Sequence, residues 1–232
     1  MSVRSRVAFA SGASGAVGAA LLLTGRIDGS VVLAFFLAFA VRVGASAALS
    51  DAGPILAAVA SKSLIRRAFL APAWGFALAA AVVRAGSVDL TDVRGANAVA
   101  GLALVRGPTL TVVGSWLAFA AAAVATLAWQ RVGAETAGSG SVGVIEAPMS
   151  LRRLEAAGVA AEVALLVSLF AGPQIDSASD AVWWFVGAGL LGAAALLGRH
   201  RADGLLSHRS LPLAAGTAGA VGLVLVLLGG AP

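Results

Sequence analysis

Long apolar runs are the feature of this sequence that most limits its fold. They are roughly 17–22 residues long, and a helix of about 20 apolar residues crosses the hydrocarbon core of a bilayer. Only 12% of the 232 residues are charged, about half the fraction of roughly 25% found in soluble domains. We therefore predict an all-α integral membrane protein in which residues 1–232 form a single transmembrane helical domain. Seven transmembrane helices are expected, at residues 7–24, 30–49, 69–86, 108–129, 156–172, 181–198 and 211–230.

The distribution of Lys and Arg predicts the orientation of these spans. If all seven cross the membrane, eleven of the sixteen basic residues lie on the side of the N-terminus, which we call side A. Four lie on the opposite side, side B, and Arg42 lies inside a span. Because loops rich in Lys and Arg stay in the cytoplasm, we expect a cytoplasmic N-terminus and a multi-pass protein of the cell's inner membrane.

Two further apolar segments are too short to span a bilayer. Residues 53–68 predict a short membrane-parallel helix on side A, and residues 95–106 predict a half-helix on side B that ends at Gly107-Pro108. Such segments occur at membrane depth where protein covers them. The pattern therefore suggests neighbouring subunits.

The residue types argue against several kinds of cofactor in this chain. There are no cysteines, so thiolate ligands for zinc or an iron–sulfur cluster are absent. The two histidines, His200 and His208, lie in one polar loop, which argues against a bis-His haem. The basic residues belong to membrane loops and do not form a patch with aromatic residues, so we expect no nucleic-acid partner.

The order of motifs resembles that of a known family of membrane proteins. A span ends in an acidic turn with glycine and serine, a short amphipathic segment with a serine beside a charged residue follows, and an Ala-Pro pair opens the next span. The residues at these places are Ser50-Asp51-Ala52-Gly53, Ser61-Lys62-Ser63, Ala71-Pro72 and then Pro108. Residues 28–92, 145–172 and 198–216 together resemble the membrane-anchor family that respiratory complex I shares with the membrane-bound NiFe hydrogenases and the formate hydrogenlyases. We call it the complex I–hydrogenase anchor family.

The resemblance implies a membrane-anchor subunit that binds no redox cofactor itself. In this family the anchor links a peripheral redox arm to antiporter-like subunits that translocate protons, and the Fe–S clusters and any NiFe centre belong to partner subunits. The family's first helix has no counterpart here, so seven helices are expected instead of eight. The acidic loop that lines the quinone chamber of complex I is reduced to residues 131–155 and lacks its Arg-x-Pro-hydrophobic-Asp motif. This difference argues against quinone binding and favours the hydrogenase-like branch.

Four ionisable residues are candidates for a proton path. Glu162 lies inside an apolar run, where an ionised carboxylate is costly and normally faces a polar cavity or a partner. Glu155 precedes it by seven residues on the same helix face. Arg42 lies inside a span that ends near Asp51, and we expect it to be the counter-ion of an acid such as Glu162. The alternative is a structural carboxylate that pairs with an arginine and transports no proton.

Basic residues on side A are candidates for docking the peripheral arm. They are Lys62, Arg66, Arg67, Arg152 and Arg153. The alternative is that they only set the topology and attract anionic lipid. On side B, Asp89, Asp92 and Arg94 are expected to be ordinary loop residues.

Three functions remain open on the sequence alone. The first is the anchor subunit, a non-catalytic part of an oxidoreductase complex. The second is a structural scaffold of such a complex that pumps nothing, which the shortened acidic loop suggests. The third is a stand-alone small transporter, against which the two membrane-parallel segments and the scarcity of polar residues in the spans argue.

Overall fold

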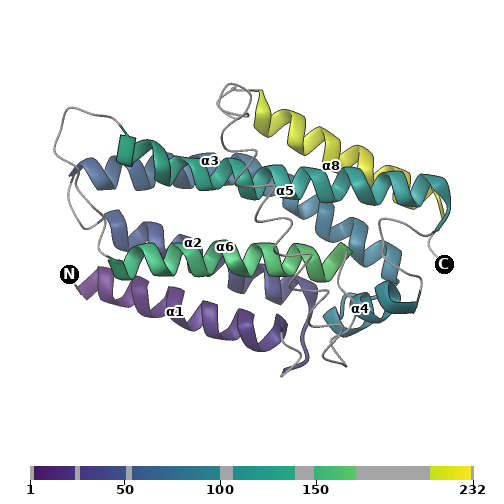
Figure 1. Cartoon of the computed structure of the whole chain (residues 1–232), viewed down its shortest axis with the longest axis horizontal. Helices are drawn as coiled ribbons and strands as arrows, with labels where there is room; N and C mark the ends of the chain where they lie inside the picture. Colours follow the sequence, from purple (N-terminus) through teal and green to yellow (C-terminus); the bar gives the residue numbers. More distant parts are fainter. Residues whose placement is uncertain are drawn as a thin grey trace.

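The computed structural model describes residues 3–23, 27–50, 54–99, 107–138, 149–170 and 210–230. Within these ranges every named secondary-structure element is a helix, and one isolated bridge joins Ser30 and Asp89. The helices are α1 (Val3–Leu23), α2 (Val31–Ser50), α3 (Pro54–Ala85), α4 (Leu90–Val99), α5 (Thr109–Gly138), α6 (Met149–Phe170) and α8 (Leu211–Leu228). The long helices run side by side along one axis, and the short α4 lies at one end of the bundle (Figure 1).

Within the described residues, five helices are long and apolar enough to cross a membrane. Their candidate spans are Arg6–Leu23, Val31–Ser50, Arg67–Ala85, Thr109–Thr126 and Leu211–Leu228. They agree with five of the predicted spans, so the all-helical class is confirmed and the helices fit a membrane protein. The predicted span at 156–172 corresponds to α6, whose apolar part, Ala156–Phe170, is shorter than the other five. The predicted span at 181–198 lies outside the described residues.

The structure corrects both predicted membrane-parallel segments. Residues 53–68 were expected to form a separate helix, but α3 continues from Pro54 to Ala85 with Pro72 inside it. A proline removes one helical hydrogen bond, yet here both of its flanks belong to one helix packed against α2, α5 and α8. The second segment begins earlier than predicted, because α4 already starts at Leu90.

The loop predicted at 131–155 is helical at both of its ends. Helix α5 continues to Gly138, and α6 begins at Met149. The remaining residues of this loop, 139–148, lie outside the described residues. The N-terminus of the chain, the starts of α3 and α6 and the ends of α2 and α5 all lie at the same end of the bundle (Figure 1). This end corresponds to side A.

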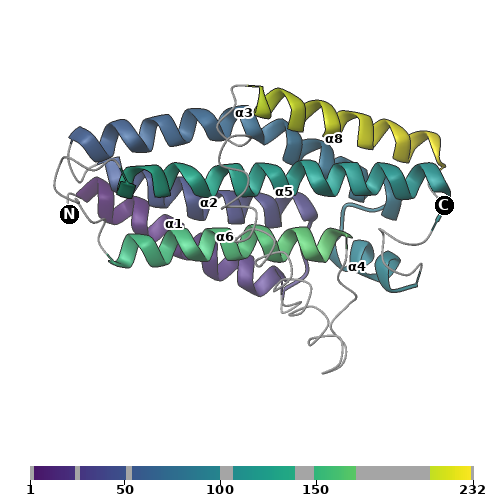
Figure 2. The same ribbon diagram turned by 45° about the horizontal axis from the view of Figure 1, so that its top comes forward.

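The six long helices among the described residues form two groups of three. Helices α1, α2 and α6 pack against one another, as do α3, α5 and α8, and contacts of α2 with α3 and of α5 with α6 join the groups (Figure 2). Glycines permit the closest approaches within each group. Gly44 of α2 lies against the backbone of α1 at Gly12, and Gly222 of α8 lies against the backbone of α5 at Gly114. Small residues at such positions let membrane helices pack closely.

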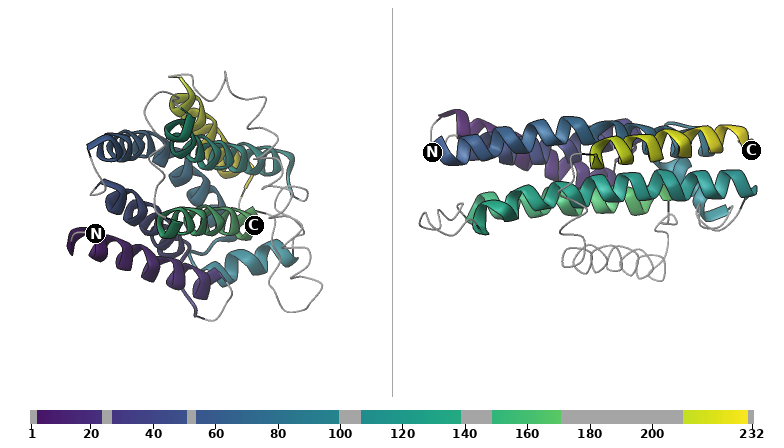
Figure 3. Two further views of the ribbon diagram at one scale, coloured as in Figure 1. Left: turned by 60° about the vertical axis from the view of Figure 1, so that its left-hand side comes forward. Right: turned by 90° about the horizontal axis from the view of Figure 1, so that it is seen from above.

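The two groups are displaced along their common axis. Trp74 of α3 packs on Phe35 of α2 with 5.6 Å between ring centroids, and two turns away Arg67 of α3 contacts Arg42 of α2. This register places the centre of the α3 span beside the first third of α2. At 1.5 Å per residue, the centres of the apolar spans of α2 and α3 differ by about 10 Å along this axis. In agreement, α1 occupies the half of the bundle near the N-terminus and α8 the half near the C-terminus (Figure 3).

Candidate functional site: a buried arginine–glutamate cluster

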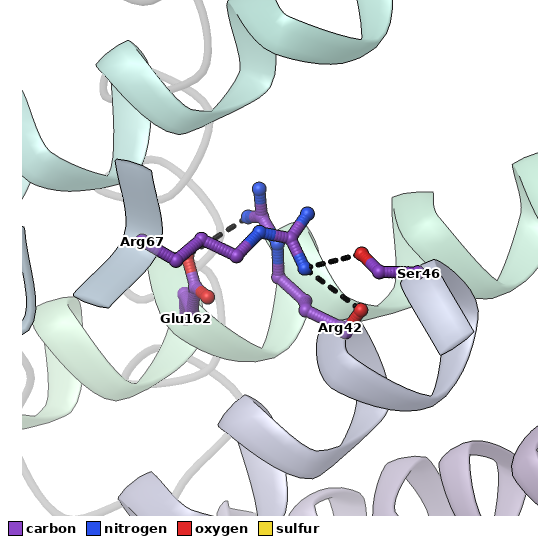
Figure 4. A network of polar contacts seen from close by, with 4 residues as sticks. All are labelled: Arg42, Ser46, Arg67 and Glu162. Atoms are coloured by element: carbon purple, nitrogen blue, oxygen red, sulfur yellow. Dashed lines mark hydrogen bonds and ion pairs between the residues drawn. The ribbon is translucent and has the colours of Figure 1, made fainter. Parts of the chain in front are cut away.

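Glu162 of α6 and Arg42 of α2 form an ion pair inside the bundle. The Nη1 atom of Arg42 donates a hydrogen bond to Oε2 of Glu162 at 2.9 Å (Figure 4). The side chains are 0% and 2% exposed, respectively. The predicted pairing of these two residues, which lie 120 positions apart in the sequence, is therefore confirmed.

Arg67 joins this ion pair from α3. Its Nη1 atom donates hydrogen bonds to the carbonyl oxygen of Arg42 at 2.8 Å and to Oγ of Ser46 at 2.7 Å (Figure 4). The Arg67 side chain is 2% exposed. Arg67 was predicted to dock a peripheral subunit, but its guanidinium group is buried between α2 and α3 and is not available on a surface. Neighbouring residues of a helix point about 100° apart, so Arg67 can face the core although other basic residues of α3 lie beside it.

The buried arginine–glutamate cluster consists of Arg42, Ser46, Arg67 and Glu162. The residues in and around it explain how it fits between four helices. Ser46 follows Arg42 by one turn on α2, so both lie on the same face. Gly158 precedes Glu162 by one turn on α6 and leaves space that the aliphatic part of the Arg42 side chain fills. Thr126 of α5 contributes a hydroxyl group next to the Glu162 carboxylate. Both guanidinium groups attract this carboxylate electrostatically.

The cluster lies where the two displaced helix groups meet. Arg42 and Glu162 are near the middle of the apolar parts of α2 and α6, whereas Arg67 begins the α3 span and Thr126 ends the α5 span. In the group of α1, α2 and α6, the cluster is therefore halfway along the apolar segments. In the group of α3, α5 and α8, it lies at the side-A end of the apolar segments. It follows that the cluster is nearer to side A than to side B.

The side chains of the cluster can bind a proton and pair opposite charges. The cluster combines one carboxylate, which can bind a proton, with two guanidinium groups, which stay protonated in proteins. No group of three or more potential metal-binding side chains gathers in the part of the chain that the structure describes. The arrangement fits a proton-binding carboxylate held by arginines, and it also fits a purely structural ion pair.

The other predicted site residues are only partly placed. Asp51 lies outside the described residues. Helices α3 and α6 carry Lys62, Arg66, Arg152 and Glu155 near their side-A ends, but the side chains of these residues are not among those described. Arg153, near the start of α6, is exposed, as a docking residue must be.

Arg94 was predicted to be an ordinary loop residue, but it is buried. It is 6% exposed, and its Nη2 atom donates hydrogen bonds to the carbonyl oxygen of Leu23 at 2.5 Å and to Oγ of Ser168 at 3.2 Å. Burial lowers the pKa of the guanidinium group. Arg94 thus connects α4 to α6 and to the C-terminus of α1, where a cation is favourable. The spacing of Leu90, Val93 and Arg94 on one helix face is the sequence signal for this burial.

Comparison of the chain with protein-family models, with curated proteins and with solved structures finds no match in any of the three. The resemblance to the complex I–hydrogenase anchor family therefore depends on the order of motifs in the sequence.

Proposed function

We propose that the chain is a membrane-anchor subunit of a respiratory complex related to complex I and to the membrane-bound NiFe hydrogenases. In this proposal it has seven spans, a cytoplasmic N-terminus and a place in the cell's inner membrane. It fastens a peripheral redox arm on side A to antiporter-like membrane subunits. Fe–S clusters and any NiFe centre belong to the partner subunits, and the chain itself binds neither these nor a quinone.

The Arg42–Glu162 ion pair is the observation that supports this proposal most directly. Its two residues come from residues 28–92 and 145–172, two of the stretches that carry the resemblance. Ionisable residues inside membrane helices are costly and are commonly part of proton or ion pathways. The cluster also lies nearer to side A, where the proposed redox arm docks, so it fits the inner end of a proton path.

Replacing Glu162 tests the proton path in the assembled complex. In Glu162→Gln we expect redox turnover to continue while most proton translocation is lost, because the amide cannot exchange a proton. Both quantities are measured in the same membrane vesicles. The matched control is Asp92→Asn, which alters an exposed acid of α4 and should change neither. An unaltered ratio of protons to electrons in Glu162→Gln would remove Glu162 from the mechanism.

Purification from native membranes tests the anchor role itself. We expect hydrogenase-like and antiporter-like chains to co-purify with this one. A chain that purifies alone and transports a solute in vesicles would instead indicate the stand-alone transporter. The charge reversal Arg153→Glu, at an exposed position of α6, should release the peripheral arm without releasing the membrane partners.

A scaffold that pumps nothing is the second candidate, and the hydrogen bonds of Arg67 favour it. Their acceptors are a backbone carbonyl oxygen and a serine hydroxyl group of α2. The cluster therefore holds α2, α3 and α6 together whether or not Glu162 exchanges a proton. The scaffold predicts that the double variant Glu155→Gln with Glu162→Gln keeps full activity and all partners. Loss of proton translocation in this variant would exclude the scaffold.

A further inference from the structure

A groove between α3 and α8 opens on the outside of the bundle. Its volume is about 550 Å³, and its walls include Phe69, Pro72 and Phe76 of α3 and Leu213, Gly216 and Ala220 of α8. The two helices that form it lie side by side (Figure 2). Phe69 and Leu213 are 63% and 74% exposed, so the groove is reached from the surroundings of the protein and not from its core.

The position of the groove along the two helices places it in the side-A half of the membrane. Its lining residues fall between the start and the middle of each candidate span, Arg67–Ala85 and Leu211–Leu228. Along α8 the lining extends from Pro212 to Ala220, which at 1.5 Å per residue is about 12 Å. One leaflet contributes about half of a hydrocarbon core of roughly 30 Å. The groove therefore extends over most of one leaflet and does not continue across the membrane.

The surface of the groove is apolar and has open space at its base. Thr217 is the one polar residue among the described lining residues, and its hydroxyl group already donates a hydrogen bond to the Ala214 carbonyl oxygen at 3.0 Å. A Cβ atom added at Gly216 would meet no atom of the described residues within 4 Å. An occupant is consequently held by packing and not by hydrogen bonds.

We propose that this groove binds one acyl chain of a phospholipid from the side-A leaflet. Its length matches the depth of a leaflet, whereas a transmembrane helix of a partner would need a contact strip across the whole core. The apolar lining fits a hydrocarbon chain, and at this depth in the membrane the molecules that surround the protein are lipids. This site is independent of the proposed respiratory function.

Filling the groove tests the proposal. The chain is reconstituted in nanodiscs of phosphatidylcholine and phosphatidylglycerol, transferred to detergent, and analysed by native mass spectrometry for retained phospholipid. We expect the unaltered chain to retain one phospholipid, and Gly216→Leu to lower the retained fraction about tenfold, since roughly two buried methylene groups lose their contacts. Ala214→Leu is the matched control, because Ala214 is exposed on the same helix and does not line the groove. It should retain lipid as the unaltered chain does.

A second variant keeps the test decisive if Gly216→Leu does not fold. Ala220→Leu narrows the groove from the next turn of α8 and should also lower retention, with helix content and thermal unfolding checked by circular dichroism. Equal retention in the folded groove variants and in Ala214→Leu would overturn the proposal. So would loss of a co-purifying membrane protein from the groove variants at unchanged lipid retention, because the occupant would then be a partner helix.

Discussion

Gly158 of α6 lies directly against the side chain of Arg42, so that the Cγ and Cδ atoms of Arg42 fill the space of a side chain at position 158. Because residue 158 has no Cβ, Arg42 can pass over α6 and reach Glu162 one turn further along. The ion pair thus depends on a glycine that is not itself part of the polar cluster.

Gly158→Ala is therefore expected to disturb the cluster. The added methyl group overlaps with Arg42, and such overpacking costs about 1–3 kcal/mol. The free energy of unfolding in mixed micelles measures this loss. Gly75→Ala is the control, since a Cβ at Gly75 of α3 meets no described atom within 4 Å and alanine there should be neutral or slightly stabilising. Equal stability of the two variants would show that Arg42 does not depend on Gly158.

The two charges of the ion pair are expected to be strongly coupled. Arg42→Met alone leaves a buried carboxylate without its closest cation, and removal of one partner of a buried pair costs about 3–5 kcal/mol. The double variant Arg42→Met with Glu162→Leu removes both charges and should be considerably more stable than Arg42→Met. A double-mutant cycle of unfolding free energies gives the coupling. Additive effects of the two substitutions would mean that the charges do not depend on each other.

Arg67 and Arg153 are expected to have different effects on stability. Arg67→Gln loses charged hydrogen bonds to the Arg42 carbonyl and to Ser46, each worth about 1.5–3 kcal/mol in general. Arg153→Gln changes an exposed residue and should leave the unfolding free energy within about 0.5 kcal/mol of the original. Thermal unfolding of the isolated chain distinguishes them. A fully stable Arg67→Gln would return Arg67 to the docking candidates.

The contact between α5 and α8 is expected to tolerate no side chain at its closest point. A Cβ at Gly222 would lie 2.7 Å from the carbonyl oxygen of Gly114 and 2.8 Å from the backbone nitrogen of Ala118. Backbone atoms cannot move aside as flexible side chains can, so Gly222→Ala should destabilise the protein by at least about 1–3 kcal/mol. Gly216→Ala, at an open position of the same helix, is the control for the change in glycine content. Similar unfolding temperatures for both variants would contradict the close packing.

Arg94 is expected to stabilise the side-B end of α1. Arg94→Ala removes the donor to the Leu23 carbonyl oxygen and to Ser168, so amide hydrogen exchange in the last turn of α1 should become faster. Arg6→Ala, at an exposed position near the other end of α1, should leave that turn unaffected. Unchanged exchange in Arg94→Ala would indicate that the end of α1 is held by apolar contacts alone.

The sequence predicts five of the seven expected spans in agreement with the structure, because the length of an apolar run is a local property that a bilayer selects directly. It also predicts the pairing of Arg42 with Glu162, since few ionisable residues lie inside apolar runs and an unpaired charge there is costly. The burial of Arg67 is not predictable in this way. Its basic neighbours in α3 suggest a polar surface, and only the packing of α2 on α3 shows that Arg67 faces the core.

The continuity of α3 also depends on tertiary structure. Residues 53–68 are amphipathic, and this pattern is compatible both with a helix along the membrane surface and with the first turns of a long helix. The packing of α3 against its neighbours decides between the two. Arg94 is a similar case, because its hydrogen-bond partners, Leu23 and Ser168, are far away in the sequence.

The displacement of the two helix groups has a consequence for the surrounding lipid. If the bundle stood upright, the apolar segments of α1, α2 and α6 and those of α3, α5 and α8 would be centred at depths about 10 Å apart. Inclining the whole bundle brings both centres into one plane, and inclinations up to about 40° occur among membrane helices. The degree of inclination then depends on bilayer thickness, so a thinner or thicker membrane changes how far the Arg42–Glu162 pair lies from the water on side A.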